Sequence, residues 1–449
     1  PVLDSTRGQV YEKMKDCSGA LDGYTNDKDE SFVDHDWDEN GFCKTYPDSH
    51  YQPATQNEDG TYEIENAGEL YWFAAQVNDG KITDADAVLT ADITVNEGNV
   101  AGCDGTKTEG WRDWTPIIGI HYMGTFDGQG HVIRGLYFND TRVGNIGLFS
   151  NLNKEGKIQN VGLENSYFRG VAYVGGICAY SNGTIENCYN AGTITAEYDY
   201  VGGLVANNFG SIVNCYNTGN ITADKDTGGG VAAWNNSGGT IKNCYNSGTL
   251  TGGSMNGVVQ INDKDGTVEN CYYLSDSETD DFDGTTFKTA DQFASGEVTY
   301  LLNGSKPGDA NIFRQNLDNG EPTDATPVLD SAHDVVYEGK LCTSGTGYTN
   351  DEDSTSEIHA WDEDGFCKND DTHYQPAVKN AENVYEISNA GQLYWFAAFV
   401  NTEENGTYPN TSANAVLTKD IVVNENVLNE DGTLNTSGTF REWIPIGDY

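Results

Sequence analysis

The sequence predicts an all-β fold, a parallel β-helix (β-solenoid), and two observations carry this prediction. The phrase Asn-Cys-Tyr-Asn recurs along the chain, and the cysteines of three full copies and one degenerate copy lie 27, 29 and 27 residues apart (Cys188, Cys215, Cys244 and Cys271). A fixed period of this size indicates an array of stacked supersecondary units. Between the cysteines, short β-branched runs are separated by Gly and Asn, with little helical signal. Three short strands per period describe one coil of a parallel β-helix.

Equivalent residues of successive coils should lie in single file, because neighbouring coils are about 4.8 Å apart. Cysteines stacked in this way have Cβ atoms about 4.8 Å apart, whereas a disulfide prefers a Cβ–Cβ distance of about 3.5–4.5 Å. We therefore interpret these thiols as packed apolar groups. Amide side chains at a corner can hydrogen-bond from coil to coil. We therefore expect an inward aliphatic file (Ile185, Ile212, Ile241, Val268), an inward file of the four cysteines, an amide ladder (Asn187, Asn214, Asn243, Asn270) and an outward tyrosine stripe (Tyr189, Tyr216, Tyr245, Tyr272).

The ends of such a rod need covers, because open sheet edges invite pairing with other chains. Residues 66–78 begin with Asn66, a good helix N-cap, and continue with an apolar helical face. Residues 290–303 place Phe293, Val298, Leu301 and Leu302 on one side of a second expected helix. We expect these two helices to cap the solenoid.

A second, longer repeat encloses the first. The phrase Pro-Val-Leu-Asp-Ser occurs at residues 1–5 and 327–331, and Leu-Tyr-Trp-Phe-Ala-Ala occurs at 70–75 and 393–398. We therefore expect a window cut from a longer tandem array. The predicted segments are an acidic Cys/His linker module (1–60), a β-solenoid with an N-terminal capping helix (61–275), a C-terminal cap and linker (276–326), a second Cys/His module (327–380) and the start of a second, truncated solenoid unit (381–449).

Composition indicates a secreted or surface-exposed protein. The chain has 70 acidic and 24 basic residues, a formal net charge of −46. This field repels nucleic acid and anionic lipid alike, so neither is an expected partner. The sequence contains no membrane-spanning pattern. The expected partner is the chain itself, through tandem or end-to-end assembly, and host or microbial glycans or proteins are further candidate partners.

Each linker module keeps two Cys and two His, in the same order and at nearly the same spacing: Cys17, His35, Cys43 and His50, then Cys342, His359, Cys367 and His373. Two Cys and two His suit tetrahedral zinc, and a small loop-rich module needs a staple. Disulfides between Cys17 and Cys43 and between Cys342 and Cys367 are the competing interpretation, which an extracellular setting supports. The spacing lacks the tight Cys-x-x-Cys arrangement, so both interpretations stay open.

Two further candidate sites are weaker. Asp36, Asp38 and Asn40 alternate before Gly41, as calcium ligands do, but the second copy has Ala360 in the first position and no Glu closes either loop, so a plain acidic turn competes. The stripe of Tyr189, Tyr216 and Tyr245, together with Trp234, is a candidate glycan-binding face, because aromatic rings stack on sugars.

Several of these segments resemble the GLUG-motif repeats of bacterial surface proteins, found mostly in Gram-positive and often gut bacteria. The resemblance rests on Phe-Asp-Gly-Gln-Gly-His at 126–131, Gly-Leu-Phe at 147–149 and the repeated Gly-x-Ile-x-Asn-Cys-Tyr-Asn; Ser150 replaces the last Gly of the family's Gly-Leu-Phe-Gly. It covers residues 60–330 and 381 onward. It implies a right-handed β-helix on an extracellular, cell-surface stalk, filament or adhesin of a bacterium. Some members belong to immunoglobulin A metallopeptidases, but this chain lacks the His-Glu-x-x-His zinc motif.

We expect no enzymatic activity. Some parallel β-helices are polysaccharide-active enzymes whose acids cluster on one outer face. The equivalent outward positions here hold Gln159, Glu186, Val213, Lys242 and Glu269, which do not place two facing carboxylates on adjacent coils. The expected function is a structural segment of a surface fibre, stalk or adhesin. A glycan-binding adhesin is the first alternative, and a polysaccharide-active enzyme is the second.

Overall fold

The computed structural model describes residues 11–14, 21–25, 35–119, 122–275, 284–308, 310–317, 324–342, 345–352, 357–359, 361–368, 370, 372–403 and 408–447. The chain forms two compact units, residues 1–336 and 337–449. Cys17 lies outside the described residues. Among the described residues, no helix has both the length and the apolar character needed to cross a membrane.

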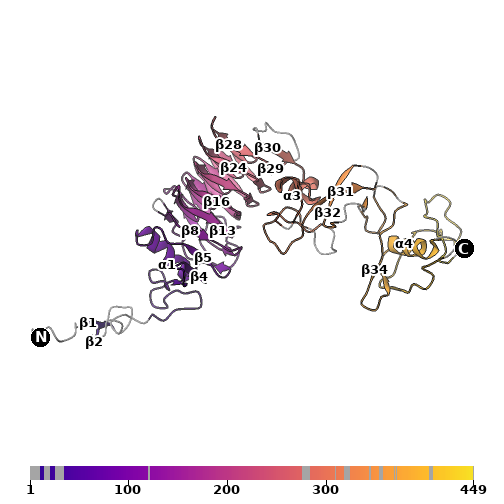
Figure 1. Ribbon diagram of the computed structural model, residues 1–449, viewed down its shortest axis with the longest axis horizontal. Helices are drawn as coiled ribbons and strands as arrows, with labels where there is room; N and C mark the ends of the chain where they lie inside the picture. Colours follow the sequence, from indigo (N-terminus) through magenta and orange to yellow (C-terminus); the bar gives the residue numbers. More distant parts are fainter. Residues whose placement is uncertain are drawn as a thin grey trace, which may run out of the picture. The chain divides into compact units, whose positions relative to one another are not determined.

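The first unit is a parallel β-solenoid whose rungs are stacked along one axis (Figure 1). Three sheets form its faces. The first sheet contains β3 (Thr55–Gln56), β4 (Tyr62–Ile64), β5 (Ala87–Leu89), β8 (Thr125–Asp127), β12 (Lys157–Gln159), β16 (Thr184–Glu186), β20 (Ser211–Val213), β24 (Thr240–Lys242) and β28 (Thr267–Glu269). The second contains β7 (Ile117–Gly119), β11 (Phe149–Leu152), β15 (Cys178–Ser181), β19 (Val205–Asn208), β23 (Ala232–Asn235) and β27 (Val259–Asn262).

The third sheet carries the strands that follow the inward cysteines. It contains β6 (Ile93–Thr94), β9 (Val132–Arg134), β10 (Tyr137–Asp140), β13 (Gly162–Gly170), β14 (Val174–Gly175), β17 (Tyr189–Ala196), β18 (Val201–Gly202), β21 (Tyr216–Asn217), β22 (Ile221–Gly229), β25 (Tyr245–Asn246), β26 (Leu250–Asn256), β29 (Cys271–Leu274) and β30 (Thr285–Lys288). An antiparallel pair, β1 (Tyr11–Met14) and β2 (Leu21–Thr25), precedes the solenoid.

The register confirms the predicted inward aliphatic file. Ile185 pairs with Ile212, Ile212 with Ile241 and Ile241 with Val268, all in parallel strands. The three isoleucines are fully buried. Cys188, Cys215, Cys244 and Cys271 are also buried, and no disulfide joins them. Burial raises the pKa of Cys215 and of Cys271 well above that of a free thiol, so both stay protonated and pack as apolar groups.

The predicted amide ladder is also present. Asn187, Asn214, Asn243 and Asn270 each donate a side-chain hydrogen bond to the asparagine one coil earlier, over 2.9, 3.2, 3.0 and 2.9 Å, starting from Asn160. All of them adopt positive φ between 52° and 54°. Asparagine tolerates this left-handed conformation better than most residues, so one residue type both turns the corner and links the coils. The sequence analysis did not predict two further amide ladders, in which every member except Asn262 is buried (Asn190, Asn217, Asn246; Asn208, Asn235, Asn262).

The N-terminal helix forms as predicted, and the C-terminal one does not. Helix α1 (Ala67–Asn78) is capped by the Asn66 side chain, which accepts a hydrogen bond from the Glu69 N–H. The expected single helix over 290–303 is wrong. The chain instead forms α2 (Ala290–Ala294) and α3 (Glu297–Leu302), because Gly296 between them has a φ of 88° that ends the first helix.

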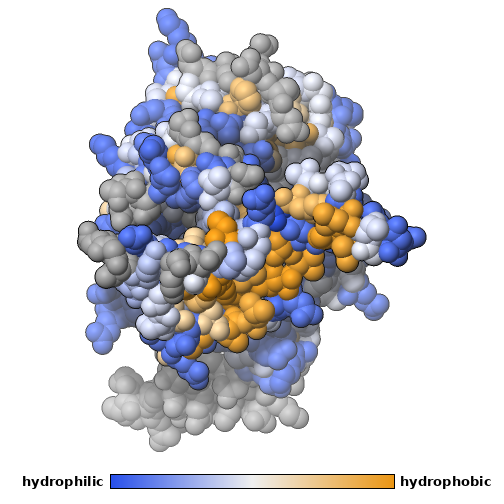
Figure 2. Space-filling view, turned by 90° about the vertical axis from the view of Figure 1, so that its right-hand side faces the viewer, coloured by the Kyte–Doolittle hydropathy of each residue, from blue (hydrophilic) through white to orange (hydrophobic). Residues whose placement is uncertain are grey.

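The second unit repeats the start of the first. It contains a three-stranded sheet of β31 (Tyr337–Leu341), β32 (Thr346–Thr349) and β33 (Glu357–Ile358), the helix α4 (Ala390–Asn401), and a second sheet of β34 (Val378–Lys379), β35 (Tyr385–Ile387) and β36 (Ala415–Leu417). Large apolar side chains remain exposed in this unit (Val416, Leu417, Val422, Leu428, Leu434, Ile444). Figure 2, which views the side of the molecule with the chain's C-terminus, shows a contiguous apolar patch.

Candidate metal centre

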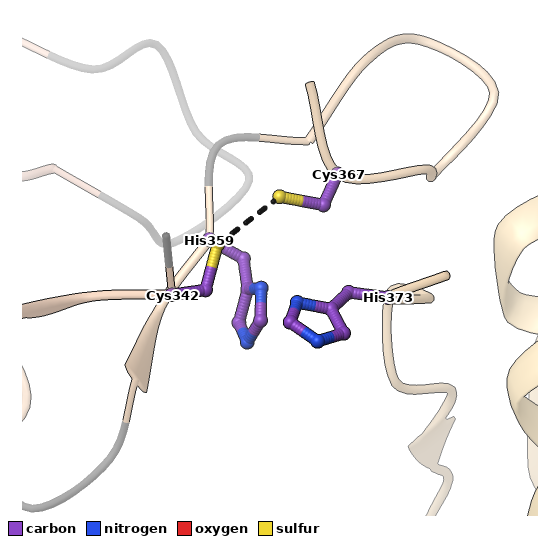
Figure 3. Close-up of side chains that lie close together, drawn as sticks. All are labelled: Cys342, His359, Cys367 and His373. Atoms are coloured by element: carbon purple, nitrogen blue, oxygen red, sulfur yellow. Dashed lines mark hydrogen bonds between the residues drawn. The ribbon is translucent and has the colours of Figure 1, made fainter. Parts of the chain in front are cut away.

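The four predicted ligands of the second module come together in space. Cys342 directly follows β31, His359 directly follows β33, and Cys367 and His373 lie in the loop that precedes β34. Their ligand atoms lie within 4.8 Å of one another. Figure 3 shows the two thiols and the two imidazole rings gathered around one point. Four residues spread over the 31 positions from Cys342 to His373 therefore form a single compact set of candidate ligands.

The sulfur geometry suits a shared metal. The Cys342 and Cys367 Sγ atoms are 3.4 Å apart and are not joined by a disulfide. A disulfide would need a separation of about 2.05 Å. Zinc–sulfur bonds of about 2.3 Å at a tetrahedral angle place two sulfurs about 3.7 Å apart. A small adjustment would therefore complete a zinc tetrahedron.

The arrangement of the two imidazole rings also suits a shared metal. His359 and His373 lie edge to face with centroids 4.8 Å apart, and both Nδ1 atoms are buried without a hydrogen-bond partner. Buried polar atoms without partners are uncommon and need an explanation, such as an ion. Burial, and then the neighbouring His373, lowers the pKa of His359. A neutral imidazole with a free lone pair is the form that binds a metal.

The first module reproduces this arrangement. The ligand atoms of His35, Cys43 and His50 lie within 4.8 Å of one another, and the two rings are again edge to face, 4.9 Å apart. Their Nδ1 atoms are likewise buried and unpartnered. Burial, with His50 as the second cause, lowers the pKa of His35. The fourth predicted ligand, Cys17, lies outside the described residues. The two copies therefore share the arrangement of two imidazoles and one thiol.

In each centre, the first histidine stacks on a tryptophan that the sequence analysis did not include. His35 stacks on Trp37 at 4.6 Å and 18°, and His359 stacks on Trp361 at 4.8 Å and 17°. The indole holds the plane of the first imidazole, which orients its nitrogens toward the other ligands. The signal was present in the sequence, because both modules contain His-x-Trp.

The residues proposed for calcium have other partners. The Asp36 carboxylate pairs with Lys44 at 2.8 Å. The Asp38 carboxylate accepts the backbone N–H groups of Asn40 and Phe42, both over 2.9 Å, and so closes a tight turn. Asp362 does the same in the second copy. These contacts support the acidic-turn interpretation of Asp36, Asp38 and Asn40.

The tyrosine stripe exists, but the expectation that it forms an exposed face is wrong. The rings of Tyr189, Tyr216 and Tyr245 stack nearly parallel at 4.8 and 4.9 Å. Tyr216 is 6% exposed and Tyr245 0%, because α2, α3 and Phe313 pack over them. Trp234 lies elsewhere and donates its indole N–H to Asp263 over 3.0 Å. The four residues proposed for glycan binding therefore do not form one surface.

The comparison with family models agrees with this architecture. The family model described as the GLUG motif matches residues 198–222, so the chain contains a GLUG repeat within a β-solenoid. Halomucin of Haloquadratum walsbyi (strain DSM 16790 / HBSQ001) is 30% identical over 139 residues, which is 30% of this chain and 1% of halomucin. A Bacteroides ovatus crystal structure, described as that of a candidate immunoglobulin A1 protease, is similar with 21% identity and a TM-score of 0.44, over 62% of this chain and 94% of that one. The Gram-positive origin stays a prediction.

Proposed function

We propose that this chain is a non-enzymatic, structural segment of an extracellular surface array, built from tandem β-solenoid units that begin with metal-stapled Cys/His modules. The observation that carries the proposal is the in-register stacking of like residues, from the isoleucine file to the amide ladder. Such a rod pairs most of its backbone internally, and each repeat packs on its neighbours. The likeness to part of halomucin supports a surface location.

The side chains on the outer face of the first sheet favour a structural role over catalysis. Lys157 pairs with Glu186 at 2.8 Å, and Lys242 pairs with Glu269 at 3.0 Å. Glycoside hydrolysis needs two carboxylates that face each other across a substrate. Here Glu186 and Glu269 each pair with a lysine of the preceding coil, which ties the coils together instead.

Zinc is the metal that we propose for the modules. Cys342, His359, Cys367 and His373 would hold it in the second module, and His35, Cys43 and His50 in the first, with Cys17 as the sequence-predicted fourth ligand. Two thiolates and two imidazoles in a closed set are typical of structural zinc, which supplies folding free energy rather than chemistry. Elemental analysis with thiol counting tests this: about one zinc per module with reactive thiols after chelation supports it, whereas blocked thiols without zinc would establish the disulfides.

The surface array is tested by imaging. Electron microscopy of the native cell surface, with antibodies against the solenoid, should show label on extended projections outside the envelope. Label confined to the cell interior, or on compact particles without projections, would contradict the proposal. Incubation of the purified chain with a panel of polysaccharides should release no product.

A second candidate function, glycan binding, is favoured by a groove beside the tyrosine stripe. The groove has a volume of about 1060 Å³ and is lined by Arg134, Glu164 and Tyr189 on one side and by Val328 and Leu329 on the other. The Tyr189 hydroxyl donates to Glu164 over 2.6 Å, and Arg134 bridges Glu164 and Asp92 at 2.9 and 2.8 Å. An aromatic ring beside fixed polar groups suits a neutral saccharide.

A glycan array separates the two candidates. Binding that Tyr189→Ala abolishes and Tyr198→Ala leaves intact would establish the groove as a glycan site, because Tyr198 is an exposed tyrosine outside the groove. Absence of binding to the whole array would leave the structural role alone.

A further inference from the structure

The loop that carries each set of candidate metal ligands is joined directly to the helix that begins the solenoid cap. In the first copy, the Gly68 N–H of α1 donates to the Asn40 carbonyl over 2.7 Å. Gly41 lies so close to α1 that a Cβ on Gly68 would overlap the Gly41 carbonyl. Asn40 and Gly41 directly precede Phe42 and the ligand Cys43, so the ligand loop and the helix N-terminus touch at backbone distance.

Side chains on both sides of this contact are buried together. Phe42 is buried beside Cys43 and packs edge-on against Tyr71 of α1, with ring centroids 5.4 Å apart. The Gln52 amide, which follows His50 in the loop, donates to the buried Glu69 carboxylate of α1 over 3.0 Å. Removal of the loop would therefore expose Phe42 and leave a helix carboxylate without one of its partners, which costs stability.

The second copy builds the same junction. The Gly391 N–H of α4 donates to the Asp364 carbonyl over 2.6 Å, and a Cβ on Gly391 would overlap the Gly365 carbonyl. Phe366 packs against Tyr394 with centroids 5.5 Å apart. Asn389, the N-cap of α4, donates to Gln375 over 2.7 Å. An arrangement present twice in one chain is a built feature of the module.

The ligand loop contains little regular secondary structure. In the described part of the first module, residues 35–51 contain only two isolated bridges, Trp37 with Cys43 and Phe42 with Tyr51. Loops with so little regular structure need a staple to stay ordered. Hydrogen bonds within the loop, the helix N-terminus and Arg112, which packs over the Phe42 ring and donates to the Pro47 carbonyl over 2.9 Å, hold this loop, and the donor set would add the staple.

We infer that metal occupancy of each Cys/His centre controls how firmly the adjacent cap helix is docked, α1 in the first copy and α4 in the second. The inference rests on the proposed metal centres. Metal binding would order the ligand loop. The ordered loop would hold its glycine and the neighbouring phenylalanine against the helix N-terminus, Gly41 and Phe42 against α1 and Gly365 and Phe366 against α4. The first helix has a second support, because Phe73 packs against Phe126 of the following coil at 6.0 Å. The dependence should therefore be greater for α4.

Hydrogen–deuterium exchange of the full chain, with zinc and after EDTA treatment, tests the inference. Zinc removal should speed exchange about tenfold or more in α4 and less in α1, with no change in β16 and β20 at the centre of the solenoid. In the presence of zinc, His373→Ala should loosen α4 only and His50→Ala should loosen α1 only. His131→Ala is the control, because His131 lies in the solenoid beside Asp92 and outside both centres.

The outcomes separate the two proposals. Stoichiometric zinc with unchanged exchange in both helices would overturn the coupling and leave the metal centres in place. Failure to bind zinc in either module would overturn the metal centres and the coupling together. Loosening of both helices by either single variant would show a global effect and would also overturn the coupling.

Discussion

The start of the first unit and the start of the second have the same local structure. Apolar residues after the helix that are buried in the first unit are, however, exposed at the equivalent positions of the second. Helices α1 and α4 carry equivalent N-caps and module contacts. Leu89 is 0% exposed, whereas its counterpart Leu417 is 59% exposed; Trp114 is 1% exposed and its counterpart Trp443 43%. In the first unit a coil follows: β5 pairs with β8, and the Trp114 indole donates to Gly147 over 3.1 Å. In the described part of the second unit, β36 pairs only with β35.

This difference separates two levels of folding. The module and its helix form the same contacts with or without a following coil, so their structure is local. The apolar face that they present becomes core only when another coil packs on it. A solenoid repeat cannot bury its apolar face alone, and its stability includes the interface with its neighbour.

The largest expected effect is the loss of stability when equivalent leucines of the two copies are each replaced by alanine. Leu89→Ala should lower the local free energy of unfolding around α1 by about 2–5 kcal/mol, because it removes a fully buried side chain and leaves a cavity. Leu417→Ala should change that of α4 by no more than about 0.5 kcal/mol, because Leu417 is largely exposed. Native-state hydrogen exchange of the two helices measures both. Equal effects would show that the exposure difference does not exist in solution.

A glycine substitution should act alike in both copies. Gly68→Ala and Gly391→Ala each force a Cβ into a backbone carbonyl of the ligand loop, so each should destabilise its own helix by about 1–3 kcal/mol. Gly253→Ala is the matched control, because a Cβ there meets its nearest neighbour at 3.9 Å. Exchange of α1 and α4 is again the measurement. A neutral Gly68→Ala would mean that loop and helix are not in contact.

The smallest expected effect is a loss of stability at alkaline pH, which should be greater for the solenoid than for the second unit. Burial raises the pKa of the Cys178, Cys215 and Cys271 thiols above the ordinary value near 8.5. The folded state therefore keeps protons that the unfolded state releases. The contribution of these groups is fully present below about pH 8.5 and is lost progressively as the pH rises above it. Urea unfolding at pH 7 and pH 10 should show a greater loss for the solenoid than for the second unit. A solenoid that is equally stable at both values would contradict the buried-thiol description.

Much of the fold could be predicted because it depends on periodicity. The spacing of Cys188, Cys215 and Cys244 defines the coil, and the Asn ladder follows from that spacing. The ligand set at Cys342, His359, Cys367 and His373 could be chosen because the chain repeats it. The break at Gly296 was missed because its positive φ depends on the local turn, and the residues on both sides of it favour a helix.

The sequence alone determined the coil, the side of each strand on which a residue lies, and the candidate ligands Cys342, His359, Cys367 and His373 that gather in the second module. These follow from local alternation and from repetition along the chain. Only the tertiary structure decided whether an outward or terminal residue meets solvent or another segment. Tyr245 is buried because residues far along the chain, Phe293 and Phe313, return to cover it. Leu417 is exposed because no described segment lies upon it. Burial depends on contacts between distant segments, and those contacts leave no periodic signal in the sequence.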